Sequence, residues 1–387
     1  MKLAAIGAAL LAVGVVAAVT GVVPAETVWA IADRTWPIML FVIAITVVAD
    51  LAATAGVFDV VSASLGRWAR GRTVALWLLV VVLAVLSTAF LSLDTTAVLL
   101  TPVVVRVARA HGLPPLPFAL TTVWLANTAS LWLPVSNLTN LLAEQRLGSI
   151  GPAGFLQLLG PSALVATVAT VIALAVVNRS ALTGRFAPVE PPSISDRGLV
   201  VFSASVVVVL LPWLVSGIAP WIPASVAALL LVVAFAWRSP HSLRWAIVPW
   251  QAVVFASGLF LAVGAAQSLG AGAVVAVVAG AGDDLFALWR VAGTGMLGAN
   301  AINNLPAYLV VESAADSPAR LAALQIGVNA GALITPWASL ATLLWHRQLT
   351  GDDVSVRWGR FALLGLATAP VVVLLAVLPL AFGPQAS

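Results

Sequence analysis

Long apolar segments follow one another along the whole chain, and several exceed the roughly 20 residues that a helix needs to cross about 30 Å of hydrocarbon. A water-soluble fold of 387 residues could not bury so much apolar surface, since 62% of the residues are hydrophobic and only 8% are charged. The chain is therefore predicted to cross a membrane many times. Nine candidate crossings lie at 3–23, 36–55, 114–142, 155–178, 198–217, 222–237, 246–268, 320–345 and 361–382.

The charges that flank the apolar segments predict the topology. Residues 73–105 lie between basic clusters (Arg67 to Arg72, then Arg106 and Arg109), so the positive-inside rule places both of their ends in the cytoplasm. Counting crossings places both ends of residues 285–311 outside. Each segment is therefore predicted to be a re-entrant hairpin, with the N-terminus in the cytoplasm. The arginines occur singly or in small groups at span ends, which does not make a nucleic-acid surface.

The two halves of the chain match each other at constant spacing. Asn127 and Pro134 correspond to Asn329 and Pro336 at an offset of 202 residues, and Phe41 corresponds to Phe255 at an offset of 214, as do two flanking pairs, Trp36 with Trp250 and Gly56 with Gly270. With hairpins that open to opposite faces, this predicts two inverted-topology repeats, which are common in secondary transporters. The predicted fold is all-α and polytopic, with about nine transmembrane helices, two re-entrant hairpins and two broken helices. The first repeat covers 1–178 (hairpin 73–105, broken helix 114–142). A cytoplasmic loop and connector helix cover 179–221. The second repeat covers 222–387 (hairpin 285–311, broken helix 320–345).

Polar residues interrupt four of the apolar segments, at 92–96, 134–140, 300–306 and 335–339. A broken helix in lipid leaves unpaired backbone groups, so such breaks persist only inside protein or beside a polar cavity. We predict that the four breaks together form a solute site. The candidate binding residues are Ser92, Thr95, Thr96, Asn127, Ser136, Asn137, Asn140, Asn300, Asn303, Asn304, Asn329, Thr335 and Ser339. The alternative for each of these residues is that it braces a kink between helices.

Asp94 is the most informative of the acidic residues. A carboxylate at membrane depth costs about 2.5 to 3.5 kcal/mol on insertion scales and is a functional candidate by default, as a proton carrier or a cation ligand. The alternative is that Asp94 caps the half-helix that follows it. Asp50 is the second coupling candidate, or else a solvated helix end. Five further carboxylates are expected at the interfaces, namely Asp33, Asp59, Glu144, Glu312 and Asp316.

Several classes of site are excluded or unsupported. The chain has no cysteine, so disulfides and thiolate metal sites are excluded. The three histidines all fall in predicted cytoplasmic loops, and no phosphate-binding glycine motif of the Walker type occurs. We therefore expect no cofactor and no metal centre. The energy for transport must come from an ion gradient or from another subunit.

Five segments resemble the ArsB-type arsenite and antimonite permeases of the ion transporter superfamily. They are SLDTTAVLLTP (92–102), LPVSNLTNLL (133–142), PWQAVVFASGLFLAVG (249–264), NNLPAYL (303–309) and ITPWASLATLLW (334–345). The resemblance covers nearly the whole chain and implies a scaffold part, a transport part with two hairpins, and proton-coupled export of trivalent metalloid hydroxides. It also implies a cytoplasmic ATPase partner in some systems. The family's acidic hairpin tip falls on Asp94 and its asparagine pair on Asn303 and Asn304, whereas Leu93 and Ala307 depart from the pattern.

The expected function is therefore secondary transport of a small inorganic solute across the cytoplasmic (inner) membrane, coupled to protons. A sodium/proton antiporter of the same superfamily is the alternative, followed by other anion or carboxylate carriers. An intramembrane aspartyl protease would need two facing aspartates at depth, and only Asp94 qualifies clearly. A passive scaffold subunit would not explain the symmetric breaks. The lipid bilayer, a cytoplasmic ATPase and a second copy of the chain are the candidate partners, and nucleic acid is not.

Overall fold

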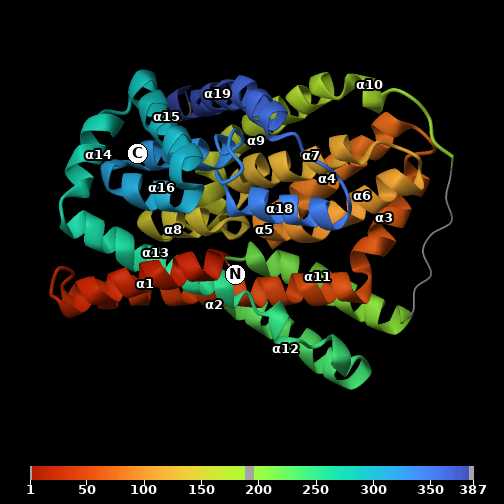
Figure 1. Cartoon of the computed structure of the whole chain (residues 1–387), viewed down its shortest axis with the longest axis horizontal. Helices are drawn as coiled ribbons and strands as arrows, with labels where there is room; N and C mark the ends of the chain where they lie inside the picture. Colours follow the sequence, from red (N-terminus) through yellow and green to blue (C-terminus); the bar gives the residue numbers. More distant parts are fainter. Residues whose placement is uncertain (1, 188–195, 383–387) are drawn as a thin grey trace.

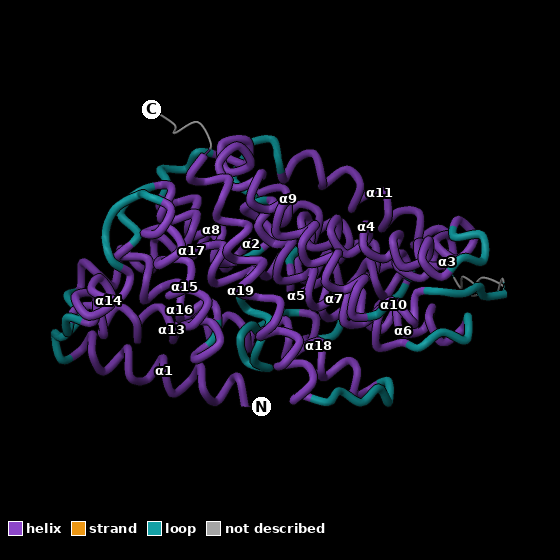
Figure 2. The backbone as a smooth tube through the Cα atoms, turned by 90° about the horizontal axis from the view of Figure 1, so that it is seen from above, coloured by secondary structure: helices purple, strands orange, loops and turns teal. Residues whose placement is uncertain are grey.

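The computed structural model describes residues 2–187 and 196–382, which fold almost entirely into helices (Figures 1 and 2). Seven described helices are long and apolar enough to cross a membrane. They are α2 (Ala25–Ala55), α4 (Thr73–Leu91), α9 (Gly151–Val177), α11 (Arg197–Leu214), α12 (Trp221–Arg238), α13 (Trp250–Ser268) and α19 (Trp358–Phe382). The prediction of an all-helical, polytopic membrane protein is therefore confirmed.

Six of the nine predicted crossings correspond to these helices, and α4 is instead the first arm of the predicted hairpin 73–105. The predicted crossing 3–23 is the shorter helix α1 (Lys2–Val19). The crossings 114–142 and 320–345 are each divided near a proline, Pro134 or Pro336, which has no N–H to continue a helical ladder. Re-entry of the hairpins and inversion of the repeats stay predictions.

The remaining helices are not among the seven, and all except α15, which has 18 residues, are shorter than these. They are α3 (Val57–Trp68), α5 (Leu93–Thr95), α6 (Thr101–Ala110), α7 (Pro115–Thr128), α8 (Leu138–Arg146), α10 (Arg179–Leu182), α14 (Ala271–Ala279), α15 (Leu285–Ile302), α16 (Asn304–Val311), α17 (Pro318–Ala330) and α18 (Leu340–Gly351). The π-helical turn is η1 (Thr96–Leu100), and the 3₁₀ turns are η2 (Ala129–Trp132), η3 (Pro134–Ser136), η4 (Pro240–Ser242), η5 (Trp245–Ile247) and η6 (Glu312–Ala314).

The helices lie in two groups. In the lower part of Figure 1, α1, α2, α11, α12 and α13 run side by side, and we call these five the long-helix layer. The two hairpins, the broken helices, α9 and α19 lie above them, and we call these the hairpin layer. The short helices α3 and α14 follow α2 and α13 and lead from the first group to the second. A solute site built on the hairpins is therefore walled on one side by α2 and α13.

Within the long-helix layer, α1 packs closely along α13, as both views show (Figures 1 and 2). The contact is made by glycines, because a Cβ atom on Gly258 would overlap the carbonyl oxygen of Gly7. Small residues let membrane helices approach until their backbones touch, which gains van der Waals contact that lipid cannot replace. The first helix of the chain is thereby attached to the second half of the sequence.

Two matched glycines end the long helices of the two halves. Gly56 follows α2 with φ 93° and ψ 16°, and Gly270 follows α13 with φ 91° and ψ 12°. This left-handed conformation is one that glycine adopts without the penalty that a Cβ imposes. The two positions are the pair that the 214-residue offset aligns. The matching backbone supports the predicted repeat, which stays a prediction.

The connector helix α11 begins at an exposed polar cap. Residues 188–195 of the predicted cytoplasmic loop lie outside the described residues. Asp196 accepts a hydrogen bond from the Leu199 backbone N–H at 3.0 Å, and Arg238 of α12 donates to the same carboxylate at 2.9 Å. The Leu199 N–H and the Arg238 guanidinium hold the pKa of Asp196 below its usual value.

Candidate functional site

The first hairpin reverses direction at Ser92, where α4 ends and α5 begins. Ser92 has φ 90° and ψ 159°, a conformation almost confined to glycine. Its Oγ accepts a hydrogen bond from the Thr95 backbone N–H at 3.4 Å. Hydroxyl groups join the two arms, since Thr96 Oγ1 lies 2.9 Å from Ser87 Oγ and 3.1 Å from Thr88 Oγ1. The π-helical turn η1 follows directly, and such turns are frequent at functional sites.

The second hairpin reverses at Asn303 with nearly the same backbone conformation, φ 97° and ψ 152°. Asn303 Oδ1 accepts a hydrogen bond from the Leu305 N–H at 3.3 Å, and its Nδ2 donates to the Trp337 carbonyl at 2.9 Å. The Asn304 N–H donates to the Ala338 carbonyl at 2.8 Å. The second tip is therefore attached to the second broken helix.

Strain at both tips is itself informative. A residue with a Cβ in this backbone region costs of order 1–3 kcal/mol, and it persists only where the surrounding structure holds it. Ser92 and Asn303 each receive a hydrogen bond from the backbone that follows, and each is the N-cap of the returning arm. Strained, capped tips of this kind are typical of sites that clamp a ligand.

The first broken helix is extended where α8 begins, and side chains fill the gap in its backbone bonding. Asn137 has φ −153° and ψ 149°, and Asn140 Nδ2 donates to the Ser130 carbonyl at 2.6 Å. Ser136 Oγ donates to the Ala89 carbonyl of α4 at 2.9 Å. The first break is thereby joined to the first hairpin.

The second broken helix is held by Asn300 of α15. Asn300 Oδ1 accepts from the Thr335 N–H at 3.0 Å, and Thr335 Oγ1 donates to the Asn300 carbonyl at 2.9 Å. Ser339 caps α18 by accepting from the Thr342 N–H at 3.2 Å. These bonds satisfy backbone groups that the break would leave unpaired.

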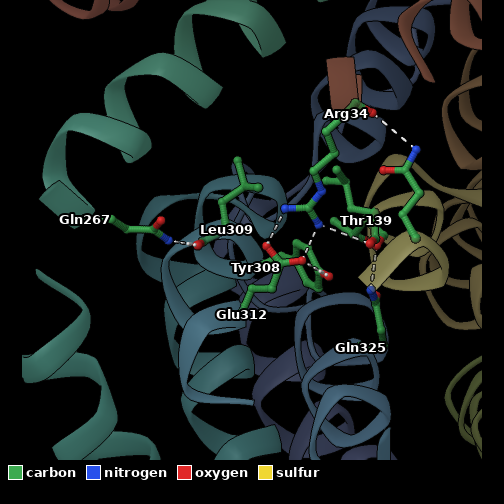
Figure 3. Close-up of polar contacts among 9 residues, drawn as sticks. Arg34, Thr139, Gln267, Tyr308, Leu309, Glu312 and Gln325 are labelled. Carbon is green, nitrogen blue, oxygen red and sulfur yellow. Dashed lines mark hydrogen bonds and ion pairs between the residues drawn. The ribbon is translucent and has the colours of Figure 1, made fainter. Parts of the chain in front are cut away.

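Asn329 joins the two halves of the molecule. Its Oδ1 accepts a hydrogen bond from Asn137 Nδ2 at 2.6 Å, and its Nδ2 lies 3.1 Å from Asn140 Oδ1 and 2.8 Å from Gln325 Oε1. Gln325 in turn donates to the Thr139 carbonyl at 2.6 Å (Figure 3). All of these groups are buried, so the network fixes the first break against α17.

A cavity of about 90 Å³ lies where the two tips and the two breaks meet α2 and α13. By the same measure one water needs roughly 10–15 Å³, so the space can hold a small solute of a few heavy atoms. We call it the central cavity. Its polar lining residues are Thr46, Ser92, Asp94, Asn137, Asn303 and Asn304.

Matched positions of the two halves line this cavity from opposite sides. Phe41 of α2 and Phe255 of α13 are one such pair, and Leu138 and Leu340 at the starts of α8 and α18 are another. The apolar residues exclude water from the walls, while the polar groups come from the hairpin tips, the first break and Thr46 of α2. The arrangement suits a small polar solute held in a largely apolar chamber.

Asp94 contributes the charge of the central cavity. Ser92, and not Asp94, caps the returning half-helix, so the carboxyl group is not used as a cap. Asp94 Oδ1 is buried and has no hydrogen-bond partner within the described part of the chain. Asp94 is also the one ionisable side chain among the described residues that line the cavity. A buried oxygen without a partner is costly, which favours a proton or a solute O–H there.

The structure separates the predicted site residues into two groups. Those that line the central cavity are Ser92, Asp94, Asn137, Asn303 and Asn304. Those that brace the breaks or the hairpin are Thr95, Thr96, Ser136, Asn140, Asn300, Asn329, Thr335 and Ser339. Asn127 does neither, because its Nδ2 donates to the Val123 carbonyl of its own helix at 2.9 Å and its buried Oδ1 has no partner within the described residues. Asp50 is half-buried on α2, one helical turn beyond Thr46, and does not line the cavity.

A second polar cluster was not predicted from the sequence. Arg34 of α2 forms an ion pair with Glu312, which is 6% exposed, and Tyr308 Oη donates to Glu312 at 2.9 Å (Figure 3). Arg34 also donates to the Leu142 carbonyl at 3.2 Å, and Gln145 Nε2 donates to the Arg34 carbonyl at 3.2 Å. We call these five residues the Arg34 cluster. Glu312 was expected at the membrane interface, and the structure instead buries it against a partner 278 residues away.

Comparison with known proteins identifies the family. The sequence profile of the CitMHS family, described as citrate transporters, matches residues 1–342. The chain belongs to the CitMHS family. This family lies within the ion transporter superfamily, as the sequence predicted. Among the described residues no cluster of three or more His, Cys, Asp or Glu side chains could hold a metal ion.

Curated relatives narrow the assignment. The arsenical pump membrane protein of Escherichia coli K12 is 31% identical over 363 residues, which cover 85% of this chain and 82% of that protein. The arsenical pump membrane protein of Yersinia enterocolitica is 29% identical over 357 residues, with the same coverage. The YdaH transporter of Alcanivorax borkumensis has a similar fold, with a TM-score of 0.58 at 16% identity over 92% of this chain and 86% of that one. These proteins are transporters, so the chain is a membrane transporter and not an enzyme.

Proposed function

We propose that this transporter exports trivalent metalloid hydroxides, As(OH)₃ and Sb(OH)₃, in exchange for protons. The observation that carries the proposal is the lining of the central cavity. It offers hydroxyl and amide groups and one carboxyl group, and no basic residue among the described residues lines it. Such a chamber suits an uncharged solute that carries O–H groups. The resemblance to curated arsenical pump proteins supports the same solute class.

Asp94 would couple the two fluxes by competition. Its partnerless Oδ1 can carry a proton or accept a hydrogen bond from a solute hydroxyl, and the protonated carboxyl is a much weaker acceptor than the carboxylate, so each event disfavours the other. Asn304 Oδ1 accepts from the Leu305 N–H at 2.9 Å, while its Nδ2 makes no hydrogen bond within the described residues. That amide can donate to a solute oxygen. Binding of the solute would therefore release the proton, and binding of a proton would release the solute.

The proton gradient is large enough to drive this exchange. One proton exchanged for a neutral solute moves one charge, and each 100 mV supplies about 2.3 kcal/mol per charge. A total driving force of about 200 mV would therefore sustain roughly a thousandfold solute gradient. Such a gradient is adequate for detoxification without ATP. A cytoplasmic ATPase subunit would add to this driving force and is not required by it.

The lining also distinguishes the rival transport classes. A carboxylate carrier must hold an anion, and the buried carboxyl of Asp94 would repel it with no basic side chain to compensate. A sodium/proton antiporter would need several oxygen ligands around one ion. Of the cavity amides, Asn137 and Asn303 use their oxygens to accept backbone N–H groups, from Thr139 at 3.4 Å and from Leu305 at 3.3 Å, so these oxygens are not free to bind a cation. These bonds shape the chamber for a neutral solute.

The proposal includes an orientation. We propose that the protein lies in the cytoplasmic membrane with its N-terminus inside, and the distribution of basic loops supports this orientation. Protons would then enter the cell while the solute leaves. Access would alternate as the hairpin layer moves against the long-helix layer.

Inside-out vesicles test the proposal directly. Uptake of arsenite and antimonite is measured under an imposed pH gradient, with and without sodium, beside vesicles that lack the protein. We expect proton-driven uptake of both metalloids that does not depend on sodium. Absence of metalloid uptake together with a sodium-dependent collapse of the pH gradient would instead support the antiporter. Uptake of citrate at the expense of metalloid would support the carboxylate carrier.

A further inference from the structure

A second cavity of about 340 Å³ lies beside the central one. It is enclosed by α2, α8, the loop that leads to α9, and the connection between α11 and α12. Its polar lining residues are Glu144, Gln145 and Ser149. Gln145 Oε1 is buried and has no hydrogen-bond partner within the described part of the chain. In the predicted topology these loops face the outside of the cell.

Two side chains separate the cavities. Phe41 of α2 and Leu141 of α8 line both of them. Both side chains are buried, at 2% and 6% exposure. On α2, Ile38 lines the second cavity alone and Ile45 lines the central cavity alone. The barrier between the two spaces is therefore a single apolar layer, one side chain from each group of helices.

The Arg34 cluster ties together the two helices that carry this barrier. Arg34 lies two helical turns before Phe41 on α2, and it donates to the carbonyl of Leu142, the residue after Leu141. Gln145 of α8 donates a hydrogen bond to the Arg34 carbonyl. Glu312, which directly follows α16, forms an ion pair with Arg34, so the end of α16 is also attached to α2 (Figure 3). Removing either partner would leave the buried Glu312 carboxylate or the half-buried Arg34 guanidinium without its counter-charge, so the complete cluster stabilises this arrangement of the helices.

We propose that the second cavity is the outer vestibule of the transport path, that Phe41 and Leu141 form its gate to the central cavity, and that the Arg34 cluster holds this gate closed. The inference rests on the proposed function for the identity of the solute, a small neutral hydroxide. Glu144 and the free Gln145 oxygen would accept hydrogen bonds from such a solute as it leaves. The long-helix layer supplies one half of the gate and the hairpin layer the other, so relative movement of the layers opens it.

Thiol labelling tests the gate, because the chain has no cysteine of its own. Ile38→Cys and Ile45→Cys are made singly, and a membrane-impermeant maleimide is added outside intact cells. We expect labelling at position 38 and none at position 45. Adding Phe41→Ala or Glu312→Gln to Ile45→Cys should raise its labelling rate by about tenfold or more, since either change makes opening easier. Val42→Ala is the matched control, because Val42 lines the central cavity alone.

The outcomes separate this inference from the proposed function. The vestibule and gate would be overturned if position 38 is not labelled, or is labelled only from the cytoplasmic side. They would also be overturned if Val42→Ala raises the labelling of position 45 as much as Phe41→Ala does. Thermal unfolding identifies any variant that fails to fold, and Leu141→Ala then replaces Phe41→Ala. Labelling needs no solute. The expected labelling pattern without any metalloid flux would therefore leave the gate standing and overturn only the proposed solute.

Discussion

The first hairpin tip presents a carboxyl group to the central cavity, whereas the second presents two asparagine amides. Their backbones are nearly the same, with φ 90° and ψ 159° at Ser92 and φ 97° and ψ 152° at Asn303. The two tips therefore share one turn geometry and differ in the chemistry of their side chains. A site with similar turns at both tips and one acidic group can bind a proton at one tip and a solute at the other.

The tips also differ in what holds them. The first is bonded mainly within its own hairpin, through Ser87 and Thr88, and Asp94 Oδ1 is left without a partner. The second is bonded to the broken helix behind it, through the carbonyls of Trp337 and Ala338. We infer that the second tip is a fixed wall of the site, whereas the first carries the group that changes state.

The largest expected effect is the loss of coupling in Asp94→Asn. This change makes both tips amides and removes the group that we propose carries the proton. Accumulation of arsenite in inside-out vesicles should fall from a roughly thousandfold gradient to none under the same pH gradient. Asp353→Asn, in an exposed turn after α18, is the matched control and should accumulate as the parent does. Full accumulation by Asp94→Asn would show that the tips do not differ in this role.

Asn329→Ala should cost stability, because the halves are joined at this residue. It leaves Asn137 Nδ2 and Asn140 Oδ1 buried without partners, at about 2–3 kcal/mol in all. Thermal unfolding in detergent measures the loss. Asn178→Ala is the control, since that side chain bonds only to the Leu174 carbonyl at the end of its own helix. Equal losses in the two variants would contradict the joining role.

The shared turn geometry can be tested by pairs of substitutions. At each tip, Ser92 or Asn303, the glycine and alanine variants lose the same capping side chain and differ only in backbone strain. The alanine variant should be less stable than the glycine variant by about 1–2 kcal/mol at both positions. Thermal unfolding of the four variants decides the matter. If the glycine variant is no more stable than the alanine variant at one of the tips, the backbone at that tip is not strained and the two tips do not share this property.

Asn304→Leu should weaken solute binding while leaving proton movement coupled. The leucine is similar in shape, and it removes the amide that can donate to a solute oxygen. We expect KM for arsenite to rise about tenfold, the value of one hydrogen bond of roughly 1.4 kcal/mol, with little change in the maximal rate. Initial rates across an arsenite series give both constants. An unchanged KM would show that the Asn304 amide does not bind the solute.

The smallest effect is expected at an exposed carboxyl far from the tips. The lowered pKa of Asp196 keeps it ionised from about pH 5 to 8, so its stabilising contribution is lost only as the pH falls through its folded-state pKa. Asp196→Asn should therefore leave the pH profile of transport in that range unchanged and alter only unfolding in acid. A shift of the transport profile in that range would show that Asp196 contributes to transport and contradict this expectation.

Much of this architecture could be predicted from the sequence, because it depends on local patterns. The apolar segments predict the long helices, and the polar residues at 92–96 and 300–306 mark the positions where the chain turns back. Asp94 stands out because a carboxylate is costly at that depth. Its alternative role as a helix cap could be excluded only when Ser92 was seen to accept the Thr95 N–H.

What the sequence could not predict is which polar side chain faces the solute. Thr96 and Asn140 have the same chemistry as the lining residues, yet they bond to Ser87 Oγ and the Ser130 carbonyl. That choice depends on packing between segments that are distant in the chain. Phe41 and Phe255 were noticed as matched residues, and only the fold shows that both line the cavity. Glu312 looked like a helix end because its partner, Arg34, is 278 residues away.

The most direct test of the account is whether arsenite moves protons. Proteoliposomes that contain only this protein are loaded with arsenite and a pH-sensitive dye and then diluted into arsenite-free buffer, with no imposed pH gradient and no sodium. The account predicts that arsenite efflux acidifies the lumen, and that Asp94→Asn abolishes this acidification. Arsenite efflux with no change in luminal pH would contradict the central claim that one hairpin tip carries the proton that is exchanged for the solute.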